Sequence, residues 1–170
     1  CSYSLGLKRE VILDVFIIAM GFLLRVSAGA VAVGAVFSPW LLACTFFLSL
    51  FLALNKRRHE IDLLKDDAPE HRAVLAFYST YLLDQMIAVT TASSVLCYTM
   101  YTMSAATISR HGTSYLVVTV PFVVYGIFRY LYLVHKKKKG GAPEKVLVTD
   151  APLALNIIAW AGTSTLIINL

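Results

Sequence analysis

Long apolar runs alternate with polar segments along this chain. Residues 26–54 contain no Asp, Glu, Lys or Arg. They are too many for a single membrane span, which takes about 20 helical residues. Gly34, Ser38 and Pro39 can form a turn inside this run and divide it into two helices. The whole pattern predicts transmembrane helices at about 10–36, 39–55, 76–104, 114–135 and 151–170. We therefore expect an all-α fold, a polytopic membrane helical bundle.

Two polar segments are expected to form loops on one side of the membrane. The first is a polar loop at 55–72 with the sequence NKRRHEIDLLKDDAPEHR, and the second has the sequence HKKKKGGAPEK. If the predicted helices alternate in direction, every Lys and Arg outside them except Arg110 falls on the side of these loops. Cytoplasmic loops of membrane proteins are enriched in Lys and Arg. The pattern therefore predicts that both loops face the cytoplasm, and we expect a bacterial plasma membrane.

The composition excludes an ordinary soluble domain. Apolar residues make up 58% of the 170 residues and charged residues only 15%, against roughly 25% charged residues in soluble domains. The formal net charge of +5 comes from clusters between apolar runs. We therefore expect a lipid bilayer around the chain and no nucleic-acid partner. The first residue is Cys1, and we expect the chain to start within a longer protein.

Several charged and polar residues fall inside the predicted helices, where a charge is costly and therefore marks a candidate site. Asp14 and Arg25 are eleven residues apart in one helix, close to three turns, so we expect both on one face and about 16 Å apart along the axis. Asp84, Gln85 and Arg129 are candidates for the lining of a cavity. Since Asp84 and Arg129 fall at similar depth, we expect them to pair. A purely structural role for these charges stays open.

The polar loop carries a second set of candidates. Asp62 and Asp66 are four residues apart, so on a helix their carboxylates share a face. Carboxylates in such an arrangement can hold Mg²⁺, which prefers oxygen ligands and bridges substrate phosphates. The neighbouring basic residues can bind the remaining diphosphate oxygens; they are Lys56, Arg57 and Arg58. A solvated loop of mixed charge has the same appearance, and this alternative stays open.

These segments resemble those of a known family. The beginning of the chain is similar to the Y-x-x-x-x-K segment and following helix of the UbiA superfamily of intramembrane prenyltransferases, with the residues YSLGLKREVILDVFIIAMGFLLRVSAGA. The polar loop and the FYSTYLLDQM after it resemble the second polar motif of that family. Its K-R-R-x-E form is similar to the decaprenyl-phosphate phosphoribosyltransferase branch, as are the segments FRYLYLVH and GGAPEKVLVTDAPL.

The resemblance implies a fold and an activity. The chain would be the C-terminal half of a nine-helix bundle around a cavity that opens to the cytoplasm and to lipid. The activity would be a Mg²⁺-dependent transfer of a phosphoribosyl group from 5-phosphoribosyl 1-diphosphate to a polyprenyl phosphate. The first carboxylate motif of the family, N-D-x-x-D-x-x-x-D, would lie upstream of Cys1. We therefore expect the chain to be inactive by itself.

The resemblance also assigns roles to residues of this chain. Lys8, Asp14 and Arg25 would belong to the catalytic set. The residues that would bind the substrate diphosphate are Tyr3, Lys56, Arg57 and Arg58. Glu60 would belong to the metal site, to which the spacing adds Asp62 and Asp66.

Two other functions remain possible at this point. Within the superfamily, the alternative is polyprenyl transfer onto an aromatic acceptor such as 4-hydroxybenzoate. In another class, the chain would be a non-catalytic membrane transport or scaffold module. The expected partners under the transferase hypothesis are a polyprenyl phosphate or diphosphate and a phosphorylated small-molecule donor.

Overall fold

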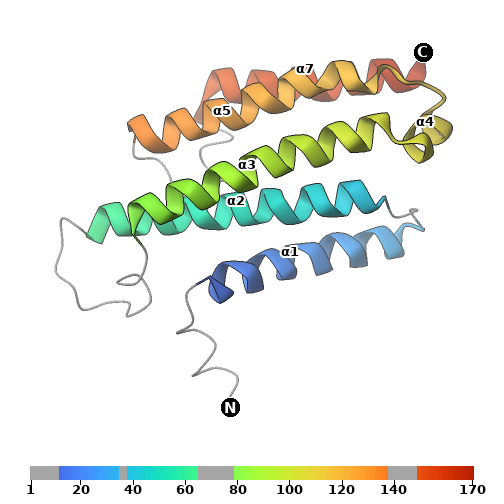
Figure 1. Cartoon of the computed structure of the whole chain (residues 1–170). Coiled ribbons are helices and arrows are strands. Elements are labelled where there is room, and N and C mark those ends of the chain that lie inside the picture. The colour runs from blue at the N-terminus through green and yellow to red at the C-terminus, as the bar shows by residue number, and fades with distance from the viewer. Residues whose placement is uncertain (1–11, 35–37, 65–78, 138–148) are drawn as a thin grey trace.

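The computed structural model describes residues 12–34, 38–64, 79–137 and 149–170. Every regular element in these residues is helical. The elements, labelled as in Figure 1, are α1 (Leu13–Ala32), α2 (Pro39–Leu64), α3 (Thr80–Met103), α4 (Ala105–His111), the 3₁₀ helix η4 (Tyr115–Thr119), α5 (Val120–Lys137) and α7 (Ala151–Asn169). The expected all-α membrane bundle is confirmed.

The long helices lie side by side along one direction (Figure 1). α2 packs between α1 and α3, and α3 connects this layer to a second one made of η4, α5 and α7. α1, α3 and α7 begin at the same end of the bundle at which α2 and α5 finish. We call this end the basic end, because it holds the arginines of α2.

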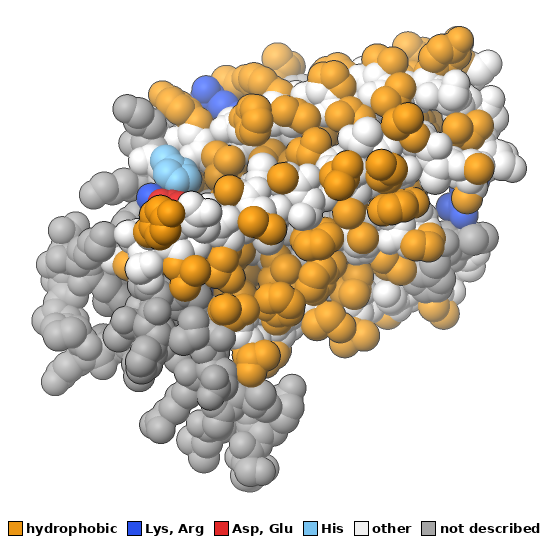
Figure 2. Space-filling view, in the orientation of Figure 1, with side chains coloured by type: hydrophobic (Ala, Val, Ile, Leu, Met, Phe, Trp, Pro, Cys, Tyr) orange, Lys and Arg blue, Asp and Glu red, His pale blue; other side chains and the backbone are white. Residues whose placement is uncertain are grey.

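Four of these helical segments are long and apolar enough to cross a membrane: Leu13–Ala32, Pro39–Ile61, Tyr115–His135 and Ala151–Asn169. Hydrophobic side chains cover most of the visible surface between the ends of the bundle, and the few visible charged side chains lie toward those ends (Figure 2). Such a surface is typical of helices in contact with lipid. The chain is therefore an integral membrane protein.

α3 has the length of the remaining expected span, 24 residues, but it is more polar than the other four. Its hydroxyl side chains donate hydrogen bonds to carbonyl oxygens of the preceding turn, from Thr90 to Met86, from Ser94 to Thr90 and from Thr99 to Val95. Such bonds satisfy these hydroxyls within their own helix. The crossing of the membrane by α3 stays a prediction.

The apolar core lies toward the basic end. Phe51 and Leu54 of α2 meet Leu83 of α3 and Leu133 of α5 there, and all four side chains are almost fully buried. The aromatic rings of Phe51 and Tyr130 lie 5.4 Å apart between their centroids. The charged residues at the basic end therefore belong to helix ends that are tightly packed against one another.

Among the described residues, the helices differ from the sequence prediction at several places, including the short α4, which was not expected. α2 runs to Leu64, so residues 55–64 of the expected polar loop are helical. This segment contains neither Gly nor Pro, and Arg57 pairs with Glu60 one turn later, which supports a helix. The expected helix at 114–135 begins as the 3₁₀ turn η4 before it continues as α5.

A cluster of hydroxyl and indole groups joins the helices away from the basic end. The Tyr98 hydroxyl of α3 accepts a hydrogen bond from Trp160 Nε1 of α7 at 2.8 Å and lies 2.8 Å from Thr119 Oγ1 of η4. Tyr98 and Thr119 are buried. One hydroxyl group therefore links three elements.

We expect Tyr98→Phe to lower the free energy of unfolding by about 1–3 kcal/mol, because it leaves the Trp160 N–H group without its acceptor and removes one of the two hydrogen bonds of the Thr119 hydroxyl, which keeps its bond to the Leu116 carbonyl oxygen. The measurement is unfolding by SDS in mixed detergent micelles. Tyr101→Phe on the same helix is the control, and it should change the stability by less than about 0.5 kcal/mol. Equal effects of the two substitutions would contradict the linking role of Tyr98.

Candidate functional site

Three consecutive basic residues lie on the last turns of α2. Successive residues of a helix point about 100° apart, so Lys56, Arg57 and Arg58 face different neighbours. Lys56 is exposed, whereas the side chains of Arg57 and Arg58 are only 16% and 15% exposed. Each arginine has a carboxylate partner from another helix.

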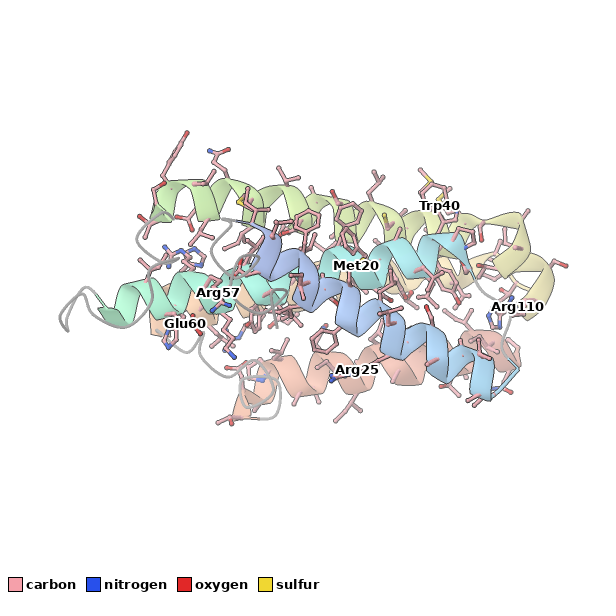
Figure 3. All side chains as sticks on the ribbon, turned by 90° about the horizontal axis from the view of Figure 1, so that it is seen from below. Met20, Arg25, Trp40, Arg57, Glu60 and Arg110 are labelled. Carbon is pink, nitrogen blue, oxygen red and sulfur yellow. The ribbon has the colours of Figure 1, made fainter. Side chains whose placement is uncertain are left out.

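Arg57 binds carboxylates of two helices. Its Nε donates to Asp14 Oδ2 of α1 at 2.7 Å, and its Nη1 donates to Glu60 Oε2 of α2 at 2.6 Å. The side chains of Asp14 and Glu60 are 11% and 22% exposed. Figure 3 shows Arg57 and Glu60 on the last turns of α2, near the start of α1. This arrangement fixes the plane of the guanidinium group.

Arg58 faces the opposite side, toward α3 and α5. Its Nε donates to Asp84 Oδ1 at 2.5 Å, and His135 Nε2 lies 3.6 Å from the same oxygen. His135 Nδ1 lies 2.9 Å from the carbonyl oxygen of Leu131. Asp84 thus links the ends of α2 and α3, and His135 of α5 lies close to it.

The expected pair of Asp84 and Arg129 is wrong. Arg129 of α5 instead binds Asp150 through two hydrogen bonds of 3.0 Å, from Nε to Oδ1 and from Nη2 to Oδ2. Asp150 also caps α7, where its Oδ1 accepts a hydrogen bond from the backbone N–H of Leu153. The two charges at similar depth face different neighbours, so depth alone did not determine their partners.

The structure does not bring Arg25 and Gln85 to this cluster. Arg25 is exposed farther along α1, and its guanidinium carbon lies 5.8 Å from the ring centroid of Phe22 on the same helix (Figure 3). Gln85 is exposed on α3. Asp14 and Arg25 therefore do not face the same neighbour among the described residues.

Other predicted site residues lie outside what the structure describes. Tyr3, Lys8 and Asp66 belong to segments that are not described, and Asp62 is described only as part of the α2 backbone. Their assignments stay predictions.

The sequence interpretation missed Asp150 as a charge partner and did not include His135 among the candidate site residues. For Asp150, the signal was its place before Ala-Pro at the start of an apolar run, the pattern of a helix N-cap. No sequence pattern indicated that His135 would come close to Asp84.

The described part of the chain contains no group of three or more His, Cys, Asp or Glu residues that could hold a metal ion. Three carboxylates lie beside Arg57 and Arg58, and each accepts a hydrogen bond from one of these arginines. They belong to Asp14, Glu60 and Asp84. A carboxylate that neutralises a guanidinium is a weaker ligand for a cation. These residues alone therefore do not fit Mg²⁺, and the binding of a substrate diphosphate here stays a prediction.

We expect Asp150→Ala to lower the free energy of unfolding by about 1–3 kcal/mol, because it removes both the helix cap and the partner of Arg129. Asp150→Asn keeps the cap but removes the charge, so its effect should be smaller. Thermal unfolding in detergent measures both variants. The double role of Asp150 is wrong if the asparagine variant is as unstable as the alanine variant.

Comparison with known proteins extends the resemblance found in the sequence. Residues 1–156 match the model of the UbiA prenyltransferase family. The decaprenyl-phosphate phosphoribosyltransferase of Mycolicibacterium smegmatis is 31% identical over 169 residues, which cover 95% of this chain and 52% of the relative. The enzyme of the same name from Corynebacterium glutamicum is 32% identical over 163 residues, or 94% of this chain and 48% of the relative.

A third relative with that name, from Mycobacterium tuberculosis, is 29% identical over 162 residues, which cover 95% of this chain and 52% of the relative. The chain thus spans about half the length of the curated relatives it matches.

Proposed function

Because this chain belongs to the UbiA prenyltransferase family, we propose that it forms part of a membrane transferase that moves a phosphoribosyl group from 5-phosphoribosyl 1-diphosphate to a polyprenyl phosphate. The observation that carries the proposal is the pair of arginines at the basic end of α2, each oriented by a carboxylate of a neighbouring helix. The name shared by the relatives supports the choice of donor and acceptor.

The proposed reaction needs no nucleophilic side chain. The bond between C1 of the ribose and the diphosphate oxygen breaks, and the electron pair leaves with the diphosphate. C1 becomes oxocarbenium-like, and an oxygen of the polyprenyl phosphate forms the new bond to it. Negative charge increases on the leaving diphosphate, so fixed guanidinium groups such as Arg57 and Arg58 stabilise the transition state more than the ground state.

The surroundings of the site suit this chemistry. The apolar core lies beside the basic end, and exclusion of water from a site there would protect an oxocarbenium-like centre from hydrolysis. The acceptor's polyprenyl chain is soluble in the bilayer, whereas the charged donor arrives from water. A site at the end of membrane helices lies at the boundary between lipid and water, where both substrates can reach it. We propose that this end faces the cytoplasm of a bacterial cell, as the distribution of Lys and Arg predicts.

Mg²⁺ is part of the proposal for the full natural protein. When bound, the ion would neutralise part of the diphosphate charge. Asp62 and Asp66 stay our candidate ligands, together with carboxylates of the upstream motif that the family resemblance implies. Glu60 was also expected at the metal, but its hydrogen bond to Arg57 favours a different role.

We expect Arg58→Met to lower kcat/KM for the diphosphate donor by about 100-fold, because a charge-assisted hydrogen bond to the diphosphate contributes about 1.5–3 kcal/mol. The measurement is transfer of radiolabelled phosphoribosyl groups to polyprenyl phosphate in membranes that contain the full natural protein. Arg110→Met on α4, at the other end of the bundle, is the matched control and should retain the activity. The assignment of Arg58 fails if both variants are equally active.

We expect the isolated 170-residue chain to show no transfer in the same assay, because about half the length of the relatives lies outside it. The upstream carboxylate motif implied by the resemblance would be among the missing parts. Mg²⁺-dependent turnover by this chain alone, reconstituted in lipid, would contradict the expectation.

A further inference from the structure

The guanidinium group of Arg57 is held by two carboxylates, although one ion pair with Asp14 would be enough to link α2 to α1. An arginine side chain has five N–H donors, and two of them, on Nε and Nη1, are bonded to Asp14 and Glu60. No other acceptor contacts this guanidinium in the described part of the chain. Three donors in the same plane therefore have no acceptor among the described residues.

The contact between Arg57 and Asp14 is not the only one that attaches α1. Val15, which follows Asp14 directly, and Ala19 one turn later are completely buried in the core. The rings of Phe16 and Phe46 form a further edge-to-face contact between α1 and α2, with centroids 5.8 Å apart. Apolar packing thus contributes to holding this end of α1, beside the ion pair of Asp14 with Arg57.

The two carboxylates also lower the local positive charge, which by itself would weaken the binding of an anion. What they provide is direction. A guanidinium group bonded on two sides loses little rotational freedom when a ligand binds, and its planar fork matches two phosphate oxygens. A lysine in the same place would offer a point charge without a fixed plane.

We propose that Asp14 and Glu60 are positioning residues, which hold the Arg57 guanidinium so that its remaining donors meet the oxygens of a bound diphosphate. This inference rests on the proposed function for the nature of the ligand. It replaces the expected catalytic role of Asp14 and the expected metal-binding role of Glu60. Both carboxylates act through Arg57 and do not contact the substrate.

The test uses the full natural protein in lipid nanodiscs and measures the dissociation constant of inorganic diphosphate by calorimetry. Asp14→Asn and Glu60→Gln remove the negative charges but keep the size of the side chains. We expect each to raise the dissociation constant about tenfold, and the KM of the transferase for its donor to rise by a similar factor with a smaller change in kcat. Asp14→Glu should restore most of the affinity.

A double-mutant cycle separates positioning from direct binding. In an Arg57→Met background, Asp14→Asn and Glu60→Gln should have no further effect on the affinity for diphosphate, because the group they orient is gone. A further loss of affinity in that background would overturn the inference, since it would mean that the carboxylates bind the ligand or its metal ion directly.

Two controls keep the result specific. Asp150→Asn breaks the ion pair of Arg129 on the other layer of the bundle and should leave the affinity for diphosphate unchanged. The melting temperature of each variant is measured alongside. If Asp14→Asn does not fold, Arg57→Lys gives the second test: it keeps the charge, and it should still lose about tenfold in affinity because it lacks the fork. Full affinity in Arg57→Lys would overturn the inference.

The failure of this inference differs from a failure of the proposed function. If Arg57→Met weakens the binding of diphosphate but Asp14→Asn and Glu60→Gln do not, only the inference is wrong. If Arg57→Met itself leaves the binding of diphosphate unchanged, the site at the basic end is wrong and the inference falls with it. If diphosphate binding follows the expected pattern but no phosphoribosyl group is transferred, the positioning role stands and the proposed donor is wrong.

Discussion

The structure depends most on the need to neutralise arginines at the end of an apolar helix. Arg57 and Arg58 lie in the last turns of Pro39–Ile61, the segment of α2 that is long and apolar enough to span a membrane, and both are largely buried. A buried guanidinium is unfavourable unless a carboxylate accepts its hydrogen bonds. Asp14 of α1 accepts a hydrogen bond from Arg57, and Asp84 of α3 accepts one from Arg58. Together with the apolar packing of α1 and α3 on α2, this requirement brings the charged groups of the three helices to one place.

Different kinds of contact join the helices at the two ends of the bundle. The basic end combines a tightly packed apolar core with charged groups whose orientation is fixed by partners on other helices. The other end is joined by neutral hydrogen bonds around Tyr98. Neutral groups provide stability without a strong field, whereas oriented charges can stabilise an anion. This division fits a protein that handles a phosphorylated substrate at one membrane surface.

The long apolar runs and the polar segments or turn residues between them were sufficient to predict the helical fold. The charged stretch after residue 54 was read as a loop, although a helix continues through it to Leu64, because charge density alone does not distinguish a polar helix from a loop. The individual ion pairs were harder to predict. Asp84 and Arg129 have similar depth, but their partners are Arg58 and Asp150, since the direction of a side chain around its helix depends on packing.

The most direct test of the account offers the full natural protein two pairs of substrates at once and identifies the lipid product by mass spectrometry. One pair is 5-phosphoribosyl 1-diphosphate with a polyprenyl phosphate, and the other is a polyprenyl diphosphate with 4-hydroxybenzoate. The account predicts a polyprenyl phosphate that carries a phosphoribosyl group, with no prenylated aromatic product. A prenylated aromatic product alone, or no product from either pair, would contradict it.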